Sequence, residues 1–340
     1  MGDEPILRLD GLHKHFAQRS SLLDSLFRRD TKAVRAVDGV SFELYEKDAI
    51  GVIGESGCGK STLLHTLIGF HTPTRGEIYY EGKPISEFSK ADWKEYRNNV
   101  QIIFQDPFNT LDPKLTIKET LKEPLIVHNI ENKEERIHEV LEQVELSPSE
   151  NYAEQFPEQL SGGEKQRVAI ARALVLEPKV ILADEPVSML DVSTQASILD
   201  LLSNLVESLG VSLLYISHDL STVSYVCDSV NVMYLGRNVE AGPTDEIIED
   251  PLHPYSQGMI SAIPIPDPDF NRPRTEIQGA PQDPIDMGEG CRFADRCPDK
   301  MDICEKSPHL IDFDSDRKVS CHLHYDHEET GEEWGRQSTD

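Results

Sequence analysis

Short apolar runs, each long enough for one buried β-strand, recur along the chain and alternate with segments of helical periodicity. Four of these runs lie at residues 49–53, 100–104, 180–186 and 212–216, and the third ends in two carboxylates. Residues 62–68 follow the first run, and their apolar positions have the three- and four-residue spacing of one helix face. The alternation of strands and helices predicts an α/β fold.

The middle of the chain breaks this alternation. Residues 106–175 predict a helical subdomain, because the segments 116–129, 132–144 and 162–176 all have helical apolar spacing. Strand–helix alternation returns over 177–250. Repeated prolines then discourage regular structure in a linker. The predicted units are a large domain over 5–255, a linker over 256–290, a small cysteine-rich domain over 291–325 and an acidic tail over 326–340.

A glycine-rich run after the first apolar segment fits the pattern G-x-x-x-x-G-K-[ST], with Gly54, Gly59, Lys60 and Ser61 at the defining positions. Between a strand and a helix, such a run forms a loop whose backbone N–H groups point inward at phosphates. Lys60 would reach the β- and γ-phosphates of ATP, and the Ser61 hydroxyl would bind Mg²⁺. The predicted ATP contacts in this loop are Gly54, Glu55, Ser56, Gly57, Cys58, Gly59, Lys60, Ser61 and Thr62.

Polar residues stand at the ends of three further apolar strands: Gln105, the pair Asp184 and Glu185, and His218. Ligands of α/β sheets bind beyond the carboxyl ends of the strands, so these residues should face the phosphate-binding loop. Asp184 would hold Mg²⁺ through water, and Ser61 and Gln105 are the other predicted Mg²⁺ contacts. Glu185 would polarise the attacking water as general base. The predicted catalytic residues are Glu185, His218 and Gln105, of which His218 and Gln105 are also predicted to contact ATP.

The run Leu-Ser-Gly-Gly-Glu-Lys-Gln-Arg at residues 160–167 separates one class of phosphate-binding-loop ATPases from the others. With it, the chain resembles the nucleotide-binding subunits of ATP-binding cassette (ABC) transporters. The motifs of that family occur in the family's order: phosphate loop 54–62, Q-loop Gln105, signature 160–167, strand end 184–185, D-loop 188–191 and H-loop His218. The resemblance covers about residues 5–255 and implies an α/β ATPase domain with a helical subdomain.

Two positions within this resemblance are an unusual D-loop residue and a candidate adenine-stacking ring. The D-loop has Met189 where the family has a smaller residue, which is a packing change with little bearing on catalysis. Phe16 lies at the place of the family's adenine-stacking aromatic residue and is therefore a predicted ATP contact. The alternative is that Phe16 is a core residue of the first strand region, and the neighbouring His13 and His15 could confuse the register.

In this family the signature completes the ATP site of the opposite subunit. Ser161 would cap a helix whose first amides, at Gly162 and Gly163, face the γ-phosphate of the partner's ATP, and Glu164 belongs to the same contact set. Glycine allows the close backbone approach that a larger residue would block. The resemblance therefore implies a second ATPase subunit, identical or different, with two ATP molecules sandwiched between the two chains.

The charge of the chain bears on its partners and surroundings. The net charge is −28, from 61 acidic and 33 basic residues, which argues against nucleic acid as a partner. An acidic surface of this size fits a cytoplasm of molar salt, as in halophilic archaea, where screening removes the self-repulsion. No apolar run approaches 18 residues and no apolar signal segment opens the chain, so we expect a peripheral protein at the cytoplasmic face of the membrane.

Four of the six cysteines fall in one short stretch with the spacing C-x5-C-x6-C-x16-C: Cys291, Cys297, Cys304 and Cys321. Disulfides are rare in a reducing cytoplasm, so clustered thiols suggest a metal or an iron–sulfur cluster. The spacing lacks the C-x2-C of common zinc sites, although His322 and His324 keep zinc open, and four free thiols are the third alternative. The other two cysteines, Cys58 and Cys227, are interpreted as structural.

These cysteines extend the resemblance to the ATPases of oligopeptide, dipeptide and nickel importers, through about residue 323. The similar segments are 105–113, 251–255, 290–298, 301–304 and 319–322. The resemblance implies a [4Fe–4S] cluster on the four cysteines, two transmembrane permease subunits as partners and, indirectly, an extracellular solute-binding protein. It implies ATP hydrolysis coupled to peptide import, with oligosaccharide or nickel import as alternatives.

Two further interpretations remain open, and the first comes from another functional class. The first is a soluble ABC ATPase that acts on DNA or ribosomes, and the single cassette and the acidic balance speak against it. The second makes the cysteine-rich end an iron or redox sensor that gates transport.

Overall fold

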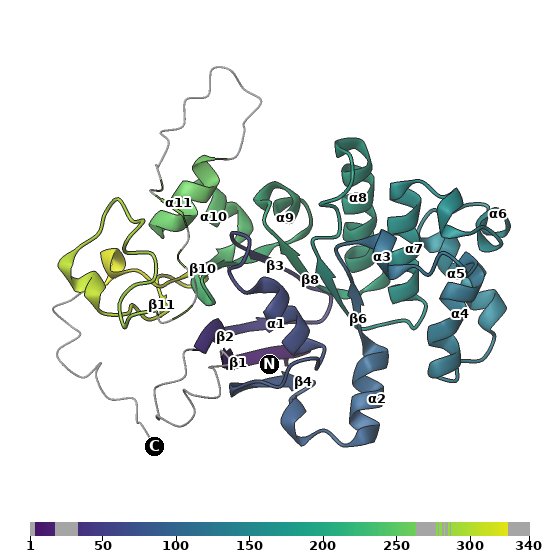
Figure 1. Ribbon diagram of the computed structural model, residues 1–340, viewed down its shortest axis with the longest axis horizontal. Helices are drawn as coiled ribbons and strands as arrows, with labels where there is room; N and C mark the ends of the chain where they lie inside the picture. Colours follow the sequence, from purple (N-terminus) through teal and green to yellow (C-terminus); the bar gives the residue numbers. More distant parts are fainter. Residues whose placement is uncertain are drawn as a thin grey trace, which may run out of the picture.

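The computed structural model describes residues 4–17, 33–262, 277, 279–280, 282, 285 and 287–325. The predicted acidic tail and much of the predicted linker lie outside these described residues. Figure 1 shows a core of strands and helices, with the helical subdomain at one end of the molecule and the cysteine-rich C-terminal part at the other.

Within the described residues, the larger sheet has the strand order β11-β12-β10-β9-β3-β8-β7-β6. Its centre is parallel, because β3 pairs with β8 and β9, and β7 pairs with β6 and β8. The bounds are β3 Ala49–Ile53, β6 Val100–Ile103, β7 Val180–Asp184, β8 Ser212–Ser217, β9 Ser229–Tyr234, β10 Arg237–Pro243, β11 Ile311–Asp312 and β12 Lys318–Val319. The four apolar runs are thus β3, β6, β7 and β8, and the predicted α/β fold is confirmed.

A second, antiparallel sheet has the order β2-β1-β4-β5 and is built from the N-terminal part of the chain. Its strands are β1 Leu7–Ala17, β2 Ala33–Leu44, β4 Arg75–Tyr80 and β5 Lys83–Pro84. Helix α1, Lys60–Leu67, lies between the two sheets (Figure 1), and its buried Leu63 and Leu64 share one apolar cluster with strands of both. The sequence pattern did not predict this division into two sheets.

The larger sheet is buried on both faces, and the side chains of β8 show how. Leu213 and Tyr215 belong to the apolar cluster that includes α8, Val192–Leu209, and α9, Leu220–Val226. Leu214 and Ile216, one residue along, belong to the cluster around α1. A strand directs alternate side chains to opposite faces, so a strand covered on both sides reads as a continuous apolar run.

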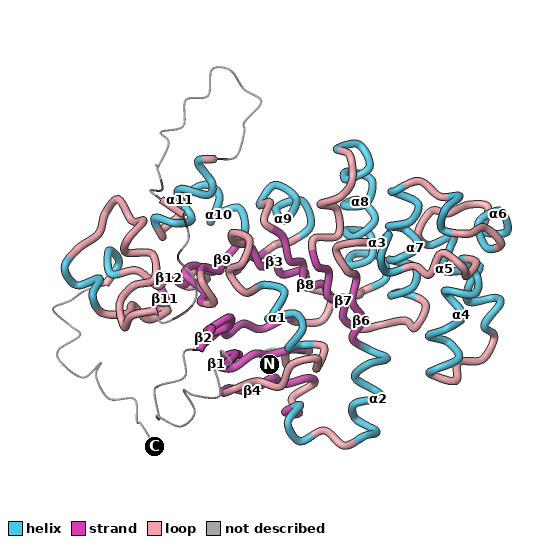
Figure 2. Tube along the Cα trace, viewed as in Figure 1, coloured by secondary structure: helices cyan, strands magenta, loops and turns pink. Residues whose placement is uncertain are grey.

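The helical subdomain spans the predicted region and is seen at the right of Figure 2. Its helices are α3 Pro107–Thr110, α4 Ile117–Val127, α5 Lys133–Gln143, α6 Ser149–Ala153 and α7 Gly162–Leu174, with the 3₁₀ turn η3 Pro157–Gln159. The three predicted helices are present as α4, α5 and α7, with their ends a few residues inside the predicted bounds. Thr116 and Ser161 cap α4 and α7 in capping boxes with Glu119 and Glu164.

The remaining helices lie between β5 and β6, after β10, or within the C-terminal part. They are α2 Lys90–Asn99, α10 Thr244–Glu249 and α11 Pro254–Ser261, together with the 3₁₀ turns η2 Ile85–Glu87, η4 Asp302–Glu305 and η5 His322–His324. Helix α11 continues past residue 255, so the predicted domain boundary falls inside a helix. Strand β12 pairs with β10, with Val319 opposite Glu240, so the cysteine-rich part extends the edge of the larger sheet.

The buried carboxylate of Asp38, on β2, joins three parts of the molecule. One of its oxygens lies 2.9 Å from His13 Nδ1 and 2.7 Å from His15 Nε2 on β1. The other accepts hydrogen bonds from Arg237 on β10, at 3.1 Å, and from Arg292 of the C-terminal part. Burial alone would raise the pKa of Asp38, but these hydrogen bonds and positive charges hold it far below its usual value.

The same carboxylate and the two histidines are the one group of three potential metal ligands, among the described residues, whose ligand atoms lie within 4.8 Å of one another. Two guanidinium groups already contact the Asp38 carboxylate, so the local field opposes a further cation. We interpret the group as structural.

Candidate functional site

The phosphate-binding loop connects β3 to α1 and passes very close to its neighbours. A Cβ atom on Gly54 would lie 2.1 Å from the Met233 carbonyl oxygen, and one on Gly59 would lie 1.9 Å from the Ala36 carbonyl oxygen. Gly59 also has a φ of 109°, in the region that favours glycine. Glycine is therefore required at both ends of the loop.

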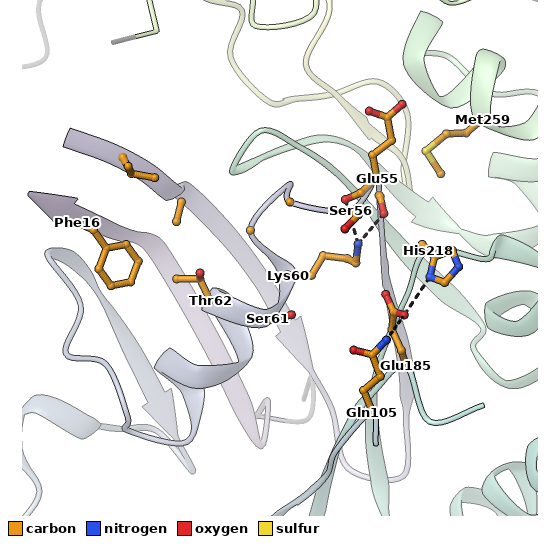
Figure 3. A pocket seen from close by; sticks show the side chains of 15 residues that line it. Phe16, Glu55, Ser56, Lys60, Ser61, Thr62, Gln105, Glu185, His218 and Met259 are labelled. Atoms are coloured by element: carbon orange, nitrogen blue, oxygen red, sulfur yellow. Dashed lines mark hydrogen bonds and ion pairs between the residues drawn. The ribbon is translucent and has the colours of Figure 1, made fainter. Parts of the chain in front are cut away.

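Lys60 lies across the inside of this loop, where Figure 3 shows its side chain among the lining residues. Its buried Nζ donates hydrogen bonds to the carbonyl oxygens of Gly54, at 2.6 Å, and Glu55, at 3.1 Å. The loop's N–H groups would hold a phosphate chain against the inner surface of the loop. The ammonium group lies on that surface, where it can supply the positive charge that the phosphates need.

A cavity of about 710 Å³ opens in front of the loop (Figure 3). Its lining contains residues predicted from the sequence, namely Phe16, Gly54, Glu55, Ser56, Gly57, Gly59, Lys60, Ser61, Thr62, Gln105, Glu185 and His218. Cys58 and Asp184 are not part of the lining, because both are buried behind it. The volume and the polar rim suit a nucleotide.

Three lining residues were not predicted from the sequence: Val34, Ala36 and Met259. Val34 and Ala36 lie on β2, next to Phe16, which pairs with Val34 across β1 and β2. Met259 comes from α11, some 200 residues from the loop along the chain. No local pattern marks these positions, because only the packing of β2 and α11 around the loop brings them there. Phe16 lies at the end of the cavity away from Glu185 (Figure 3), which places an aromatic ring far from the reacting phosphate.

The three predicted catalytic residues meet around one carboxylate. Glu185 follows β7, and its Oε2 lies 3.0 Å from Gln105 Nε2 and 3.0 Å from His218 Nδ1. The backbone of Glu185 has a φ of 44°, rare for a residue with a side chain, and its N–H donates to the Ile216 carbonyl oxygen at 2.8 Å. Strained backbone held by neighbouring strands is common at active sites, because it aims one side chain.

Asp184, the last residue of β7, lies behind Glu185 and is only 9% exposed. Its pKa is raised to about 6, first by burial and then by the neighbouring Glu185 carboxylate, and the Lys60 ammonium partly offsets both effects. Such a carboxylate gains strongly from a divalent cation, since the cation supplies the missing positive charge.

The signature lies on a separate surface. The Ser161 Oγ accepts a hydrogen bond from the Glu164 N–H at 3.3 Å, and the Glu164 carboxylate accepts one from the Ser161 N–H at 2.8 Å. These contacts cap α7 and leave the first amides of the helix, at Gly162 and Gly163, at its free end. Among the described residues that line the cavity, none belongs to the signature. The phosphate loop and the signature therefore lie on two separate surfaces of the chain.

Comparison with known proteins identifies the family of this chain. A family model described as "ABC transporter" matches residues 37–188, and one described as "Oligopeptide/dipeptide transporter, C-terminal region" matches residues 239–304. The oligopeptide transport ATP-binding protein AppF of Bacillus subtilis is 42% identical over 328 residues, which cover 94% of this chain and 98% of that protein. The chain belongs to the ATP-binding subunits of ABC transporters of the oligopeptide/dipeptide family.

A second relative and a solved structure extend the comparison. The oligopeptide transport ATP-binding protein OppF of Escherichia coli is 40% identical, covering 94% of this chain and 96% of that protein. A dimeric, post-hydrolysis structure of the ATP-binding cassette MJ0796 bound to ADP and Pi is 29% identical, with a TM-score of 0.59, over 70% of this chain and 98% of that one. The chain is thus an ABC ATPase. None of its described helices is long and apolar enough to cross a membrane.

The four clustered cysteines of this ABC ATPase lie together in the fold. They line one small cavity, which contains Cys291, Cys297, Cys304 and Cys321 and also Met301. All are free thiols, and burial is the largest cause that raises the pKa of Cys321, to about 12. Burial also raises the pKa of Cys291 and Cys297, so these three thiols favour the protonated form unless a metal displaces the protons.

The arrangement of this cysteine site bears on which group it could hold. Four thiolates around one zinc ion at about 2.3 Å would lie within roughly 4 Å of each other. No such tight group occurs there among the described residues. The Nε2 atoms of His322 and His324 lie 3.0 and 2.9 Å from the carbonyl oxygens of Lys306 and Leu252. The described residues therefore do not form a preformed site for one zinc ion at these cysteines.

Asp184→Asn should stabilise the nucleotide-free protein at pH 7.5 and abolish its response to Mg·ATP. The pKa is raised in the fold, from 3.8 to about 6, so the native state loses stability as pH rises through this window. Removing the carboxylate should recover about 1–3 kcal/mol above pH 6 and almost nothing at pH 4. Thermal unfolding with and without Mg·ATP measures both effects.

The control for this prediction is Glu207→Gln, which removes an exposed carboxylate from α8. It should change neither stability nor the Mg·ATP response. Equal melting temperatures of Asp184→Asn and wild type at pH 7.5, or an Asp184→Asn protein still stabilised by Mg·ATP, would contradict the assignment.

Proposed function

We propose that this ABC ATPase energises the import of oligopeptides or dipeptides across the cell membrane. The observation that supports it most is the extent of the similarity to oligopeptide transport ATP-binding proteins, which includes the C-terminal region beyond the general cassette. The ATPase is proposed to act as a peripheral subunit at the cytoplasmic face, beneath two transmembrane permease subunits that receive peptides from an extracellular binding protein.

The positions of the side chains support the proposed roles of the ATP-site residues. Phe16 stacks on the adenine, the loop N–H groups and Lys60 hold the phosphates, and Ser61, Gln105 and Asp184 form the Mg²⁺ side of the site. Mg²⁺, when bound, neutralises charge on the β- and γ-phosphate oxygens. Glu185 accepts the proton of the attacking water, while the contacts from Gln105 and His218 fix the direction of its carboxylate.

A second ATPase subunit, identical or different, completes each site in this proposal. Ser161, Gly162, Gly163 and Glu164 would contact the γ-phosphate of the ATP bound by the partner, because they lie off the chain's own cavity. ATP then joins the two chains and hydrolysis separates them, which is a two-state switch that permeases can use.

Glu185→Gln should slow ATP hydrolysis by about 100-fold or more, because a general base contributes that much, while ATP binding persists. The expected product is a closed, ATP-bound dimer on size-exclusion chromatography, together with lost uptake of labelled di- and oligopeptides by cells that carry only this variant. Hydrolysis at the wild-type rate would contradict the assignment of the base.

The same experiment separates the cargo alternatives. Peptide uptake that persists while hydrolysis is lost would overturn the peptide assignment and leave oligosaccharide or nickel as cargo, to be tested with those solutes. Recovery of the chain with ribosomes or DNA, and not with two multi-spanning membrane proteins, would overturn the transporter role itself.

Lys60→Ala, which removes the counter-charge inside the loop, should abolish nucleotide binding and serves as the inactive reference.

For the four cysteines we propose a [4Fe–4S] cluster with a structural or regulatory role, since ATP hydrolysis needs no electron. Protein purified without oxygen should contain about four irons per chain and show charge-transfer absorption in the visible. Cys297→Ser should lose both signals, whereas Cys227→Ser, which alters a buried thiol elsewhere, should keep them. One zinc ion per chain, or metal-free thiols after anaerobic purification, would contradict the cluster.

The charge excess supports one further proposal, that the chain works in a cytoplasm of molar salt, as in halophilic archaea. Self-repulsion of 28 net negative charges is screened over about 3 Å at 1 M salt. The free energy of unfolding should therefore rise steadily from low KCl to molar KCl. A maximum at low salt, with a decline above it, would contradict a high-salt origin.

A further inference from the structure

Two arginines, Arg292 and Arg296, lie between the first two cysteines of the cysteine site, in the segment Cys291–Cys297, and one of them contacts the nucleotide site directly. Arg296 forms a two-pronged ion pair with Glu55, the second residue of the phosphate-binding loop. Its Nη1 lies 2.8 Å from Glu55 Oε2 and its Nη2 lies 2.9 Å from Glu55 Oε1. In this geometry the planar guanidinium donates two parallel hydrogen bonds to the carboxylate, which fixes the orientation of both groups.

The ion pair is partly shielded from water, which strengthens it. The Arg296 side chain is 8% exposed and that of Glu55 is 30% exposed. The guanidinium lies 5.7 Å from the ring centre of Tyr234 and 5.9 Å from that of Phe293, and it donates to the Tyr234 hydroxyl at 3.3 Å. Breaking a shielded pair from one side leaves the other charge without its partner, which is far costlier than losing a surface ion pair.

A second contact holds the same loop residue from the same side. The Glu55 N–H donates to the Tyr255 hydroxyl at 2.8 Å, and the Tyr255 ring packs on Tyr234 and Phe293, with ring centres 4.7 and 5.5 Å away. Tyr255 and Arg296 both lie within residues 239–304, the region matched by the C-terminal family model and outside the general ABC match. The C-terminal region thus holds Glu55 by its side chain and by its backbone.

The other arginine of the segment reaches the loop by a different route. Arg292 contacts the Asp38 carboxylate and the Leu235 carbonyl oxygen, so it holds the turn between β9 and β10. In that turn the Gly236 N–H donates to the Cys58 carbonyl oxygen of the phosphate-binding loop at 2.7 Å. Each arginine therefore connects the cysteine-bearing segment with one side of the loop.

We propose that the segment Cys291–Cys297 is a positioning arm of the ATP site, in which Arg296 holds the phosphate-binding loop through Glu55 and thereby couples the four-cysteine site to ATP affinity. The proposal rests on ATP hydrolysis by this chain. It depends neither on the transported cargo nor on which group the cysteines bind.

The coupling acts on binding because Glu55 is part of the surface that receives the phosphates. Its carbonyl oxygen accepts a hydrogen bond from Lys60 Nζ, and its N–H is fixed by Tyr255. If the loop occupies its binding conformation for a smaller fraction of the time, the apparent affinity for ATP falls in proportion to that fraction. Once ATP is bound, the loop is ordered and the chemical step should change little.

The test measures KM for ATP and kcat of the full chain with Arg296 replaced. Arg296→Gln should raise KM about three- to tenfold, with kcat within about twofold of wild type, because only the fraction of binding-competent loop changes. Arg296→Lys keeps the positive charge but loses the two-pronged contact, so its KM should lie between those of wild type and Arg296→Gln. The matched control is Arg317→Gln, since Arg317 makes ion pairs within and around the same C-terminal part, to Glu246, Asp250 and Asp314. It should leave KM unchanged.

A double-mutant cycle keeps the test decisive if Arg296→Gln folds poorly. Glu55→Gln should raise KM to a similar extent, and the double variant Glu55→Gln with Arg296→Gln should be no worse than either single variant. Additive effects, or a KM for Arg296→Gln equal to that of Arg317→Gln, would overturn the positioning role.

The link to the cysteines has its own measurement. Cys297→Ser, which alters the residue next to Arg296, should raise KM for ATP in the wild-type background and have no further effect when Arg296 is already Gln. Cys227→Ser, a buried thiol outside the site, should have no effect. An unchanged KM in Cys297→Ser would overturn the coupling, while the peptide uptake and Glu185→Gln results would stand independently.

Discussion

The close approach of the phosphate-binding loop to its neighbours is the constraint on which the rest of the site depends. The loop fits between the Met233 and Ala36 carbonyl oxygens only because Gly54 and Gly59 have no Cβ. This position brings Lys60 to the inner surface of the loop and places the start of α1 beside the ends of β7 and β8. A larger residue at either glycine would displace the loop from the edge of the sheet at which the catalytic side chains lie.

The parallel sheet supplies the other half of the arrangement. Strands β6, β7 and β8 end at the same edge, so Gln105, Glu185 and His218 come together although more than 110 residues separate the first from the last. Each follows its strand directly or within two residues, where the backbone direction is set by the sheet. Rigid strands thus aim the side chains, and the positive φ of Glu185 turns its carboxylate between the other two.

These local relations explain what could be predicted from the sequence. Buried strands and capped helices leave continuous or periodic apolar patterns, and the motif residues stand at their ends, so the α/β fold and most of the cavity lining followed from the sequence. The separate N-terminal sheet, the course of α11 and the contribution of Met259 did not, because they depend on packing between segments distant along the chain. The ion pair of Arg296 with Glu55, 241 residues apart, could not be predicted from the sequence for the same reason.

The C-terminal part is joined to the ATPase domain by two kinds of contact with different consequences. Strand β12 extends the larger sheet by pairing with β10, which attaches this part to the sheet away from the nucleotide site. The arginine contacts end on Glu55 and Asp38, which belong to or border the nucleotide site. Coupling between two sites is reciprocal, so contacts that favour the ATP-binding form of the loop are in turn favoured when ATP is bound. Under the proposed coupling, ATP binding stabilises the segment that carries Cys291 and Cys297, and the cysteine site responds to each cycle of hydrolysis.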